Sequence, residues 1–578
     1  MYFWLIFNPI HAQMGFFSVH KKKVIFFSAA IFLASLFSFA PDYFEISKNL
    51  DIFNAVYREL NAGYVDDTKP GKLMKVGIDA MLNSLDPYTI YYSENDIEDY
   101  RYMTTGEYGG IGATVNDVDG KIMIVEPYEG FAAFRAGIRA GDQIVGVNNN
   151  NVLGKKTDDI SNLLKGTSGT ALSLKIIKAG QKEAVVVPLV REEIKTKAVP
   201  YYGMLQDGST GYIKLLSFTE RCSDQVKDAL LDLKSKNCKY LILDLRGNLG
   251  GFLNEAVNIV NFFIAKGQEV VFTKGKTPEW DKTYLTVNNP IDTEIPLVVL
   301  VDENSASASE IVSGALQDLD RAVIIGQRTY GKGLVQQTKP LVYNSSIKIT
   351  VAKYYIPSGR CVQALDYSNK SADGRVEKVP DSLITAFKTK GGRIVYDGAG
   401  VMPDLLSKDE RSFNLLISLL NKHFIFNYAT EYFLNHKDIG PIQQFALNNE
   451  AYADFLNYLK TKNYTYESED EIQLNALQKH AEEDSSFVDI KNEFNQLKNK
   501  LIEMKKNDLQ RQKPLIKKYL EEEIVSRYYF QKGRIQYSLN SDPEVLQAAN
   551  LLNNVNQYKG TLTYIAKANK PFNINKKF

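Results

Sequence analysis

Three apolar segments constrain the fold of this chain more than any other feature of its sequence. They lie at residues 240–243, 297–301 and 322–325. Each ends in a turn rich in glycine or other small residues, and helical patterns follow at 253–263 and 308–316. A strand covered by helices on both faces of a parallel sheet is apolar along its whole length rather than at alternate positions. Residues 193–405 are therefore predicted to form an α/β domain.

The distribution of histidine limits the chemistry of this domain. The chain has 578 residues and five histidines, which are His11, His20, His423, His436 and His480. None lies between Lys21 and Lys422, so the α/β domain contains no imidazole. A Ser-His-Asp triad or an HExxH zinc site within the domain is excluded.

Composition excludes further classes of protein. The 69 basic and 68 acidic residues leave a net charge of +1, which gives no electrostatic footprint for nucleic acid. A hydrophobic content of 44% is typical of a globular protein rather than a disordered one. The cysteines, Cys222, Cys238 and Cys361, are too few and too scattered for a zinc cluster or a disulfide framework. Unpaired thiols are favoured, with a Cys222–Cys238 disulfide as the alternative.

Residues 1–40 are predicted to be a targeting segment. Three lysines at 21–23 precede residues 24–40, which are apolar and carry no charge. This pattern is typical of a secretory signal peptide, and the run is also just long enough to remain as a membrane anchor. Both of these interpretations export the rest of the chain. A buried core helix is the less favoured alternative. The start of translation, at Met1 or at Met14, stays open.

Two further regions are predicted to be helical. Residues 41–104 carry apolar side chains at helical spacing. Residues 406–578 are helical and rich in charge, and their apolar stripe predicts a packing or self-association face. The stripe consists of Ile490, Phe494, Leu497, Leu501 and Met504. For this C-terminal region, dimerisation or gating of substrate access is a hypothesis, and a homo-oligomer is one possible state.

Residues 105–192 are β-rich and resemble a PDZ domain. The resemblance rests on GGIGATV (109–115), AGIRAGDQIVGVN (136–148) and DDISNLLKG (158–166). PDZ domains bind the C-terminus of a peptide by strand addition, with backbone N–H groups around its carboxylate. By this resemblance the carboxylate loop would consist of Gly110, Ile111, Gly112 and Ala113. A generic β-hairpin loop is the alternative for this segment.

Three segments of the α/β domain carry candidate chemistry. Residues 302–310 place serines at the start of a helix, where one can act as a nucleophile beside free N–H groups, or can simply cap the helix. Lys332 lies between Gly331 and Gly333, as a surface turn residue or as a buried base. Burial lowers a lysine pKa, so the neutral amine can accept a proton. Residues 244–251 form a glycine-rich turn suited to an oxyanion hole or to phosphate binding.

Together these segments resemble the C-terminal processing proteases, or tail-specific proteases, over residues 43–404. The motifs are GGIGA, DLRGNLGG, SASASE, TYGKGLVQ, YYIPSGRCVQ and GVMPD. The resemblance implies an α/β core with crotonase- or ClpP-like ββα layers, an inserted PDZ domain, and N- and C-terminal helices. It implies a serine endopeptidase of the bacterial periplasm or cell envelope, which needs no metal or cofactor. Its substrates would be proteins or peptides with accessible C-termini.

The same resemblance assigns roles to individual residues. Ser307 would be the nucleophile, Lys332 the base, and Gln336 the residue that orients the lysine. The oxyanion donors would be Ala308 and either Gly250 or Gly251. Leu249, where the family often has proline, leaves the choice of glycine open.

Two other functions remain as alternatives. One is a catalytically inactive PDZ scaffold, which the presence of Ser307, Lys332 and Gln336 disfavours. The other is a crotonase-like enzyme that acts on acyl-CoA thioesters, which export and the PDZ segment disfavour. If the N-terminal segment is not cleaved, the membrane is a further partner.

Overall fold

The computed structural model describes residues 43–370, 376–407, 414–462, 464–484 and 486–563. The predicted signal or anchor at 24–40 lies outside these ranges. None of the helices in the described ranges is long and apolar enough to span a membrane. The chain divides into two compact units, Met1–Ser84 and Leu85–Phe578.

The first unit contains the predicted N-terminal helices. One spans residues 43–63, and α2 spans Pro70–Asn83. The predicted helical segment 41–104 is not helical throughout, because it includes a strand. The residues after Ser84, among them this strand, belong to the second unit. That strand, β1 (Ile90–Tyr92), precedes α3 (Ile97–Thr105) and pairs antiparallel with a strand more than 250 residues later. Only this long-range pairing makes it a strand.

A six-stranded sheet forms the centre of the α/β domain. Its strands, in spatial order, are β10 (Tyr201–Met204), β11 (Thr210–Lys214), β12 (Tyr240–Asp244), β15 (Leu297–Val301), β16 (Val323–Gly326) and β23 (Leu405–Leu406). β10 is antiparallel to β11, and the other neighbours are parallel. The predicted parallel sheet is therefore present. Its last strand, β23, lies where the sequence placed the boundary between the α/β domain and the C-terminal region, at residues 405/406.

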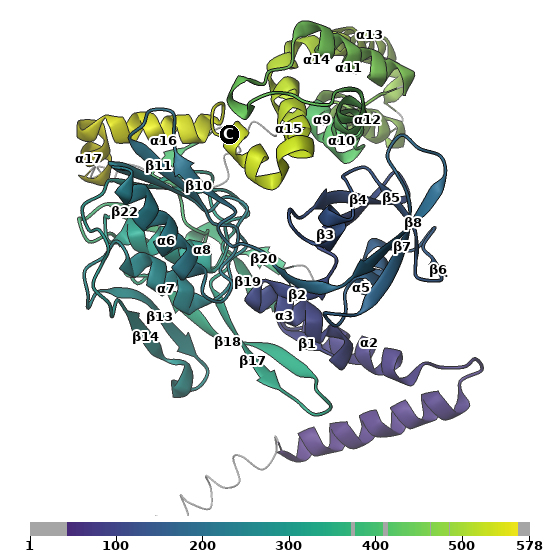
Figure 1. The fold of residues 1–578 in the computed structure, drawn as a ribbon. Helices are drawn as coiled ribbons and strands as arrows, with labels where there is room; N and C mark the ends of the chain where they lie inside the picture. Colours follow the sequence, from purple (N-terminus) through teal and green to yellow (C-terminus); the bar gives the residue numbers. More distant parts are fainter. Residues whose placement is uncertain (1–42, 371–375, 408–413, 463, 485, 564–578) are drawn as a thin grey trace, which may run out of the picture. The chain divides into compact units, whose positions relative to one another are not determined.

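Helices cover both faces of this sheet, which explains its unbroken apolar strands. The helices of one face lie together in Figure 1. They are α6 (Cys222–Ser235), α7 (Leu253–Asn261) and α8 (Ala308–Asp318). The other face packs against α16 (Pro543–Asn553) and α17 (Val555–Thr563), through Val545, Leu552 and Tyr558. The end of the C-terminal region thus contributes to the core of the α/β domain, which its helical pattern alone did not predict.

A second, antiparallel sheet lies in the same domain and was not predicted. It consists of β1, β18 (Ser346–Tyr355), β13 (Glu269–Gly275) and β14 (Lys282–Leu285), with β17 (Leu334–Pro340) also paired to β18. Two small sheets pair β19 (Leu365–Lys370) with β20 (Val376–Lys378) and β21 (Ala386–Lys388) with β22 (Ile394–Tyr396). Cys222, Cys238 and Cys361 are free, so the Cys222–Cys238 disulfide is excluded.

The β-rich region has a hydrophobic core of its own. Its strands are β3 (Ala113–Val118), β4 (Lys121–Pro127), β5 (Gln143–Val147), β6 (Asn150–Asn151), β7 (Ala171–Ile177) and β8 (Ala184–Val190). Its helices are α4 (Ala132–Arg135) and α5 (Thr157–Leu164). The chain enters through β2 (Glu107–Gly110) and leaves through β9 (Glu192–Lys195), and these two strands pair. This pairing closes the region as an insertion.

The C-terminal region contains another core, formed by α9 (Asn414–Asn421), α10 (Phe424–Asn435), α11 (Asn449–Thr461), α14 (Asp508–Arg511) and α15 (Lys513–Ser538). Between α11 and α14, the helices α12 (Glu469–Glu483) and α13 (Phe487–Lys505) pack against each other. The predicted apolar stripe lies on α13. Phe494 is buried, whereas Leu497 and Met504 are half exposed.

An ion cluster ties the six-stranded sheet to the start of α16. Asp244, fully buried, binds Arg246 at 2.6 Å and Lys214 at 3.0 Å. Arg246 also binds Asp542, at 2.9 Å, and Glu544. Burial by itself would raise the pKa of Asp244, but the charges of Arg246 and Lys214 outweigh burial and lower that pKa. Asp244 and Arg246, in the DLR part of the DLRGNLGG motif, therefore have a structural role.

Arg246→Ala is expected to destabilise this unit by about 3–5 kcal/mol, because it leaves a buried carboxylate with one cationic partner. Urea denaturation followed by circular dichroism measures the loss. Lys236→Ala is the control, since it breaks an exposed ion pair with Asp232 and should leave the midpoint unchanged. Equal midpoints for the Arg246 variant and the unmodified chain would contradict this assignment.

Candidate active site

Ser307 lies between β15 and α8, in a strained backbone conformation. Its φ is 56° and its ψ is −112°, outside the regions that a residue with a Cβ atom normally adopts. Such strain costs about 1–3 kcal/mol and is concentrated at functional sites. The neighbouring serines are structural, since Ser305 Oγ donates to Leu245 O and Ser309 Oγ donates to Asn248 O. Ser307 is thus the serine of this run whose geometry is unusual.

Lys332 lies in the loop before β17, between two glycines. Its Nζ atom is 4.2 Å from the centroid of the Tyr88 ring. Burial, helped by the nearby charge of Lys348, lowers the pKa of Lys332 to about 8, and the carboxylates of Glu310 and Asp86 oppose that shift. The direction agrees with the prediction from sequence. With this pKa, part of the Lys332 population carries a neutral amine at pH 7.

Glu310 joins the serine loop to the lysine loop, and sequence analysis gave it no role. Its buried carboxylate accepts hydrogen bonds from the backbone N–H groups of Ser307 and Lys332, both at 2.8 Å, through Oε2. Through Oε1 it accepts from Gly331 N at 2.7 Å and Thr329 Oγ1 at 2.6 Å. Burial raises the pKa of Glu310, and these four donors oppose the rise. One side chain therefore fixes the positions of both candidate catalytic residues.

Two residues of the YYIPSGRCVQ motif reinforce the same junction. The Tyr354 hydroxyl lies 2.8 Å from Lys332 O and 3.1 Å from Ser307 O. Gln363 Oε1 accepts a hydrogen bond from Gly333 N at 2.7 Å. The sequence shows these motifs, but it does not show the contacts between them. The contacts join segments far apart in the chain, and no local pattern predicts such contacts.

The geometry separates the two candidate oxyanion glycines. Gly250 donates its N–H to Asn248 Oδ1 at 2.9 Å. Among the described residues, the N–H groups of Gly251 and Ala308 find no acceptor. A Cβ atom on Gly250, whose φ is 98°, would lie 2.8 Å from Ser307 Cβ. Gly250 thus allows the loop to approach the serine, whereas Gly251 and Ala308 keep donors available.

Gln336 does not contact the lysine here. Its Nε2 atom donates to Thr350 Oγ1 at 3.3 Å. Within the described ranges, no hydrogen bond joins Gln336 to Lys332. Lys332 precedes β17 and Gln336 lies within it. The contact by which Gln336 would orient the lysine is absent from this geometry.

The predicted carboxylate loop joins β2 to β3. Gly110 ends β2, Ala113 begins β3, and Ile111 and Gly112 connect them. The carbonyls of Ile111 and Gly112 accept from Ala133 N and Tyr128 N, while the N–H groups of the same two residues have no partner in the described part of the chain. Ile111 and Ala113 line a groove of about 300 Å³ that α5 borders.

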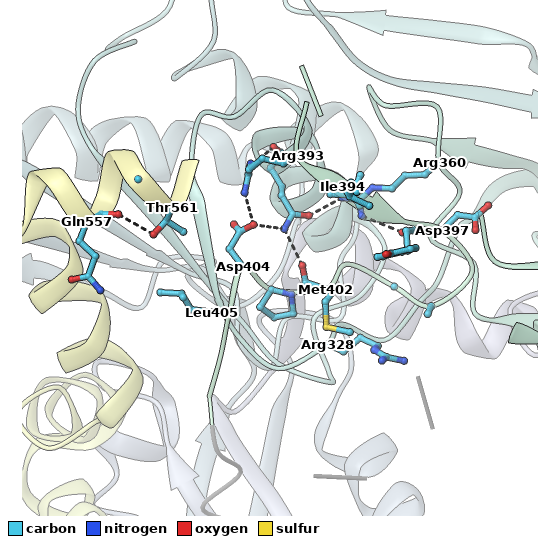
Figure 2. A pocket seen from close by; sticks show the side chains of 17 residues that line it. Arg328, Arg360, Arg393, Ile394, Asp397, Met402, Asp404, Leu405, Gln557 and Thr561 are labelled. Carbon is cyan, nitrogen blue, oxygen red and sulfur yellow. Dashed lines mark hydrogen bonds and ion pairs between the residues drawn. The ribbon is translucent and has the colours of Figure 1, made fainter. Parts of the chain in front are cut away.

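A larger cavity, of about 760 Å³, lies elsewhere and contains neither Ser307 nor Lys332. It is bordered by β22, residues 397–405 and α17. Figure 2 shows Arg393 directed at Asp404, and the two form an ion pair. Arg360 binds Asp318 at 2.9 Å. The GVMPD motif thus ends in a structural carboxylate.

In the described residues, no group of histidine, cysteine and acidic side chains could hold a metal ion.

Comparisons with known proteins match three regions of the chain. Peptidase family S41 matches residues 209–367, a PDZ domain matches 123–178, and the C-terminal helical domain of PDZ-proteases matches 415–552. These matches correspond to the α/β, β-rich and helical regions described above.

Individual relatives agree. A carboxy-terminal-processing protease of Bartonella bacilliformis is 36% identical over 354 residues, covering 60% of this chain and 81% of that protein. A CtpA-like serine protease of Staphylococcus aureus is 35% identical over 318 residues, covering 54% of this chain and 62% of that protein. A solved photosystem II D1 C-terminal processing protease is 25% identical, covering 62% of this chain and 92% of that one, with a TM-score of 0.34.

The predicted family resemblance is confirmed by the extent of the Bartonella match and by the order of the three domains. The chain belongs to the carboxy-terminal-processing proteases of peptidase family S41, which are serine-type peptidases with a PDZ domain.

Proposed function

We propose that this chain cleaves proteins near their C-terminal tails with Ser307 as nucleophile and Lys332 as general base. The observation that carries this proposal is the Glu310 carboxylate, which holds the backbone of both residues at 2.8 Å. The lowered pKa of Lys332, about 8, supports the same roles, because only the neutral amine can take a proton. An inactive scaffold or an acyl-CoA enzyme has no comparable observation in its favour.

The reaction uses the geometry in two stages. Neutral Lys332 takes the hydroxyl proton as Ser307 Oγ bonds to the substrate carbonyl carbon, and the N–H groups of Ala308 and Gly251 stabilise the oxyanion. The Lys332 ammonium then protonates the departing amine, and an ester of Ser307 remains. In the second stage Lys332 takes a proton from water, whose oxygen attacks the ester. Return of that proton to Ser307 Oγ releases the new C-terminus.

The β-rich domain selects the substrate. The tail adds as a strand beside β3, in the groove that α5 borders, and its carboxylate binds the N–H groups of Ile111 and Gly112. Gly110 and Ala113 flank these donors and hold them in place through β2 and β3.

The location and the layering of the fold belong to the same proposal. Residues 1–40 direct the chain to the cell envelope, where it acts as a periplasmic enzyme that is either released or anchored by residues 24–40. The parallel sheet with its helices and the antiparallel sheet of the same domain support crotonase- or ClpP-like ββα layers.

The test compares two peptides of identical sequence, one with a free C-terminal carboxylate and one with a C-terminal amide. The amide is expected to be cleaved with a kcat/KM about 10- to 100-fold lower, mainly through KM, because it loses charge-assisted hydrogen bonds. Gly112→Ala should remove the difference, since its Cβ atom would lie 2.3 Å from Phe131 Cβ. Equal cleavage of both peptides by the unmodified chain would contradict tail recognition.

A further inference from the structure

Tyr88 is held over the candidate base by a turn at the start of the second unit. Asp86 Oδ1 accepts the N–H groups of Tyr88 and Thr89, both at 2.8 Å. Thr89 Oγ1 accepts from Thr350 N at 3.2 Å, and β1 then pairs with β18. The turn is therefore fixed to the strand that also carries Lys348.

Two other tyrosines contact Tyr88. The Tyr88 hydroxyl lies 3.4 Å from the hydroxyl of Tyr330 and 3.3 Å from that of Tyr367. The Tyr367 ring meets the Tyr88 ring edge to face, with centroids 5.9 Å apart. These contacts leave one face of Tyr88 directed at Lys332, whose Nζ is 4.2 Å from the ring centroid.

The charged groups around Lys332 come from three elements. Glu310 on α8 and Asp86 in the turn favour its ammonium form, and Lys348 on β18 disfavours it. An aromatic face attracts an ammonium group and not a neutral amine. No hydrogen bond joins Lys332 Nζ to Ser307 within the described part of the chain, so the lysine rests against the ring.

We propose that Tyr88 is a positioning residue for the general base: its ring holds the ammonium form of Lys332 away from Ser307 and shields the amine from water. When Lys332 loses its proton the attraction to the ring disappears, and the neutral amine turns to the Ser307 hydroxyl. This inference rests on the proposed function, because it assigns Tyr88 a role in the same dyad.

The ring has two opposite effects on the lysine, and different substitutions separate them. Attraction of the cation to the ring raises the lysine pKa, whereas exclusion of water lowers it. Tyr88→Leu keeps an apolar cover and removes the aromatic face. Tyr88→Ala removes both, and Tyr88→Phe keeps both while removing the hydroxyl.

The experiment measures kcat/KM against pH for these three variants and the unmodified chain. For Tyr88→Leu the rising limb is expected about 0.5–1.5 pH units lower, the shift that loss of a cation–π contact produces. For Tyr88→Ala the limb moves to higher pH, because burial has the largest effect on the pKa of Lys332, and for Tyr88→Phe it stays in place. Tyr202→Leu, at a half-exposed position on β10, is the control and should leave the limb unchanged.

A second measurement keeps the outcome independent of cleavage. In a Ser307→Ala background, trace acetic anhydride labels Lys332 only as the neutral amine, and mass spectrometry of the peptide gives its titration. The same shifts, downward for Leu and upward for Ala, are expected there. Shifts in one common direction, or no shift with a uniform loss of rate, would overturn the role of Tyr88. If Ser307→Ala cleaves normally while the labelling shifts hold, the proposed function fails and the contact with Tyr88 stands.

Discussion

Ser307→Ala and Lys332→Met are each expected to lower kcat/KM for an unstructured C-terminal peptide by roughly 10³- to 10⁶-fold. The first removes the proposed nucleophile and the second removes the proposed base. When residues act as a unit, replacing either one removes nearly all activity. Lys332→Arg should be equally inactive, because a guanidinium does not lose its proton at accessible pH. Cleavage is measured by mass spectrometry, with circular dichroism to show that each variant is folded.

The unmodified chain should also show a rate that rises with pH through about 8, the pKa of Lys332. Protonation below that pH removes the base, and the α/β domain has no histidine to produce such a limb. Ser313→Ala is the matched control, since Ser313 Oγ donates to Ser309 O within α8. Activity within a few-fold of normal in Ser307→Ala or Lys332→Met would rule out the dyad.

Glu310→Gln is the second large effect, with an expected fall in kcat/KM of at least about 100-fold. The amide can replace only one of the two carboxylate oxygens as an acceptor, so its NH₂ group faces two of the four donors. Each charge-assisted hydrogen bond of this kind contributes about 1.5–3 kcal/mol. Loss of the carboxylate charge also lowers the pKa of Lys332, because Glu310 favours its ammonium form.

Two readouts therefore distinguish this role from general destabilisation. The plateau of kcat falls while the rising limb moves to lower pH. Glu303→Gln provides the control, because Glu303 is exposed on the same turn and should leave both unchanged. A variant that loses rate with its pH limb in place would show that Glu310 serves stability alone.

The parts of the fold that were predictable are those coded by local pattern. The strands at 240–243 and 297–301 are apolar along their length, and β12 and β15 cover them. The AGIRAGDQIVGVN motif likewise marks the end of α4 and the strand β5. In contrast, β1 has no distinctive pattern and becomes a strand only by pairing with β18. The packing of α16 on the sheet also depends on a partner surface made by distant residues.

The candidate site divides in the same way. The family resemblance supplied Ser307, Lys332 and Ala308, because short motifs mark them. It did not supply Glu310 or Tyr354 as links between the two loops, and it assigned Gln336 a contact that is absent here.

The sequence by itself therefore determined the class of the protein and its domain order, and it predicted the types of residue that would do chemistry without histidine. Spacing along the chain carries this information, because turns, caps and apolar runs are local properties. Only the tertiary structure decided how the serine and the lysine are held, which glycine keeps a free N–H, and that an aromatic ring covers the base. These features depend on distances of a few ångströms between segments far apart in the chain, and such distances exist only once the cores have packed.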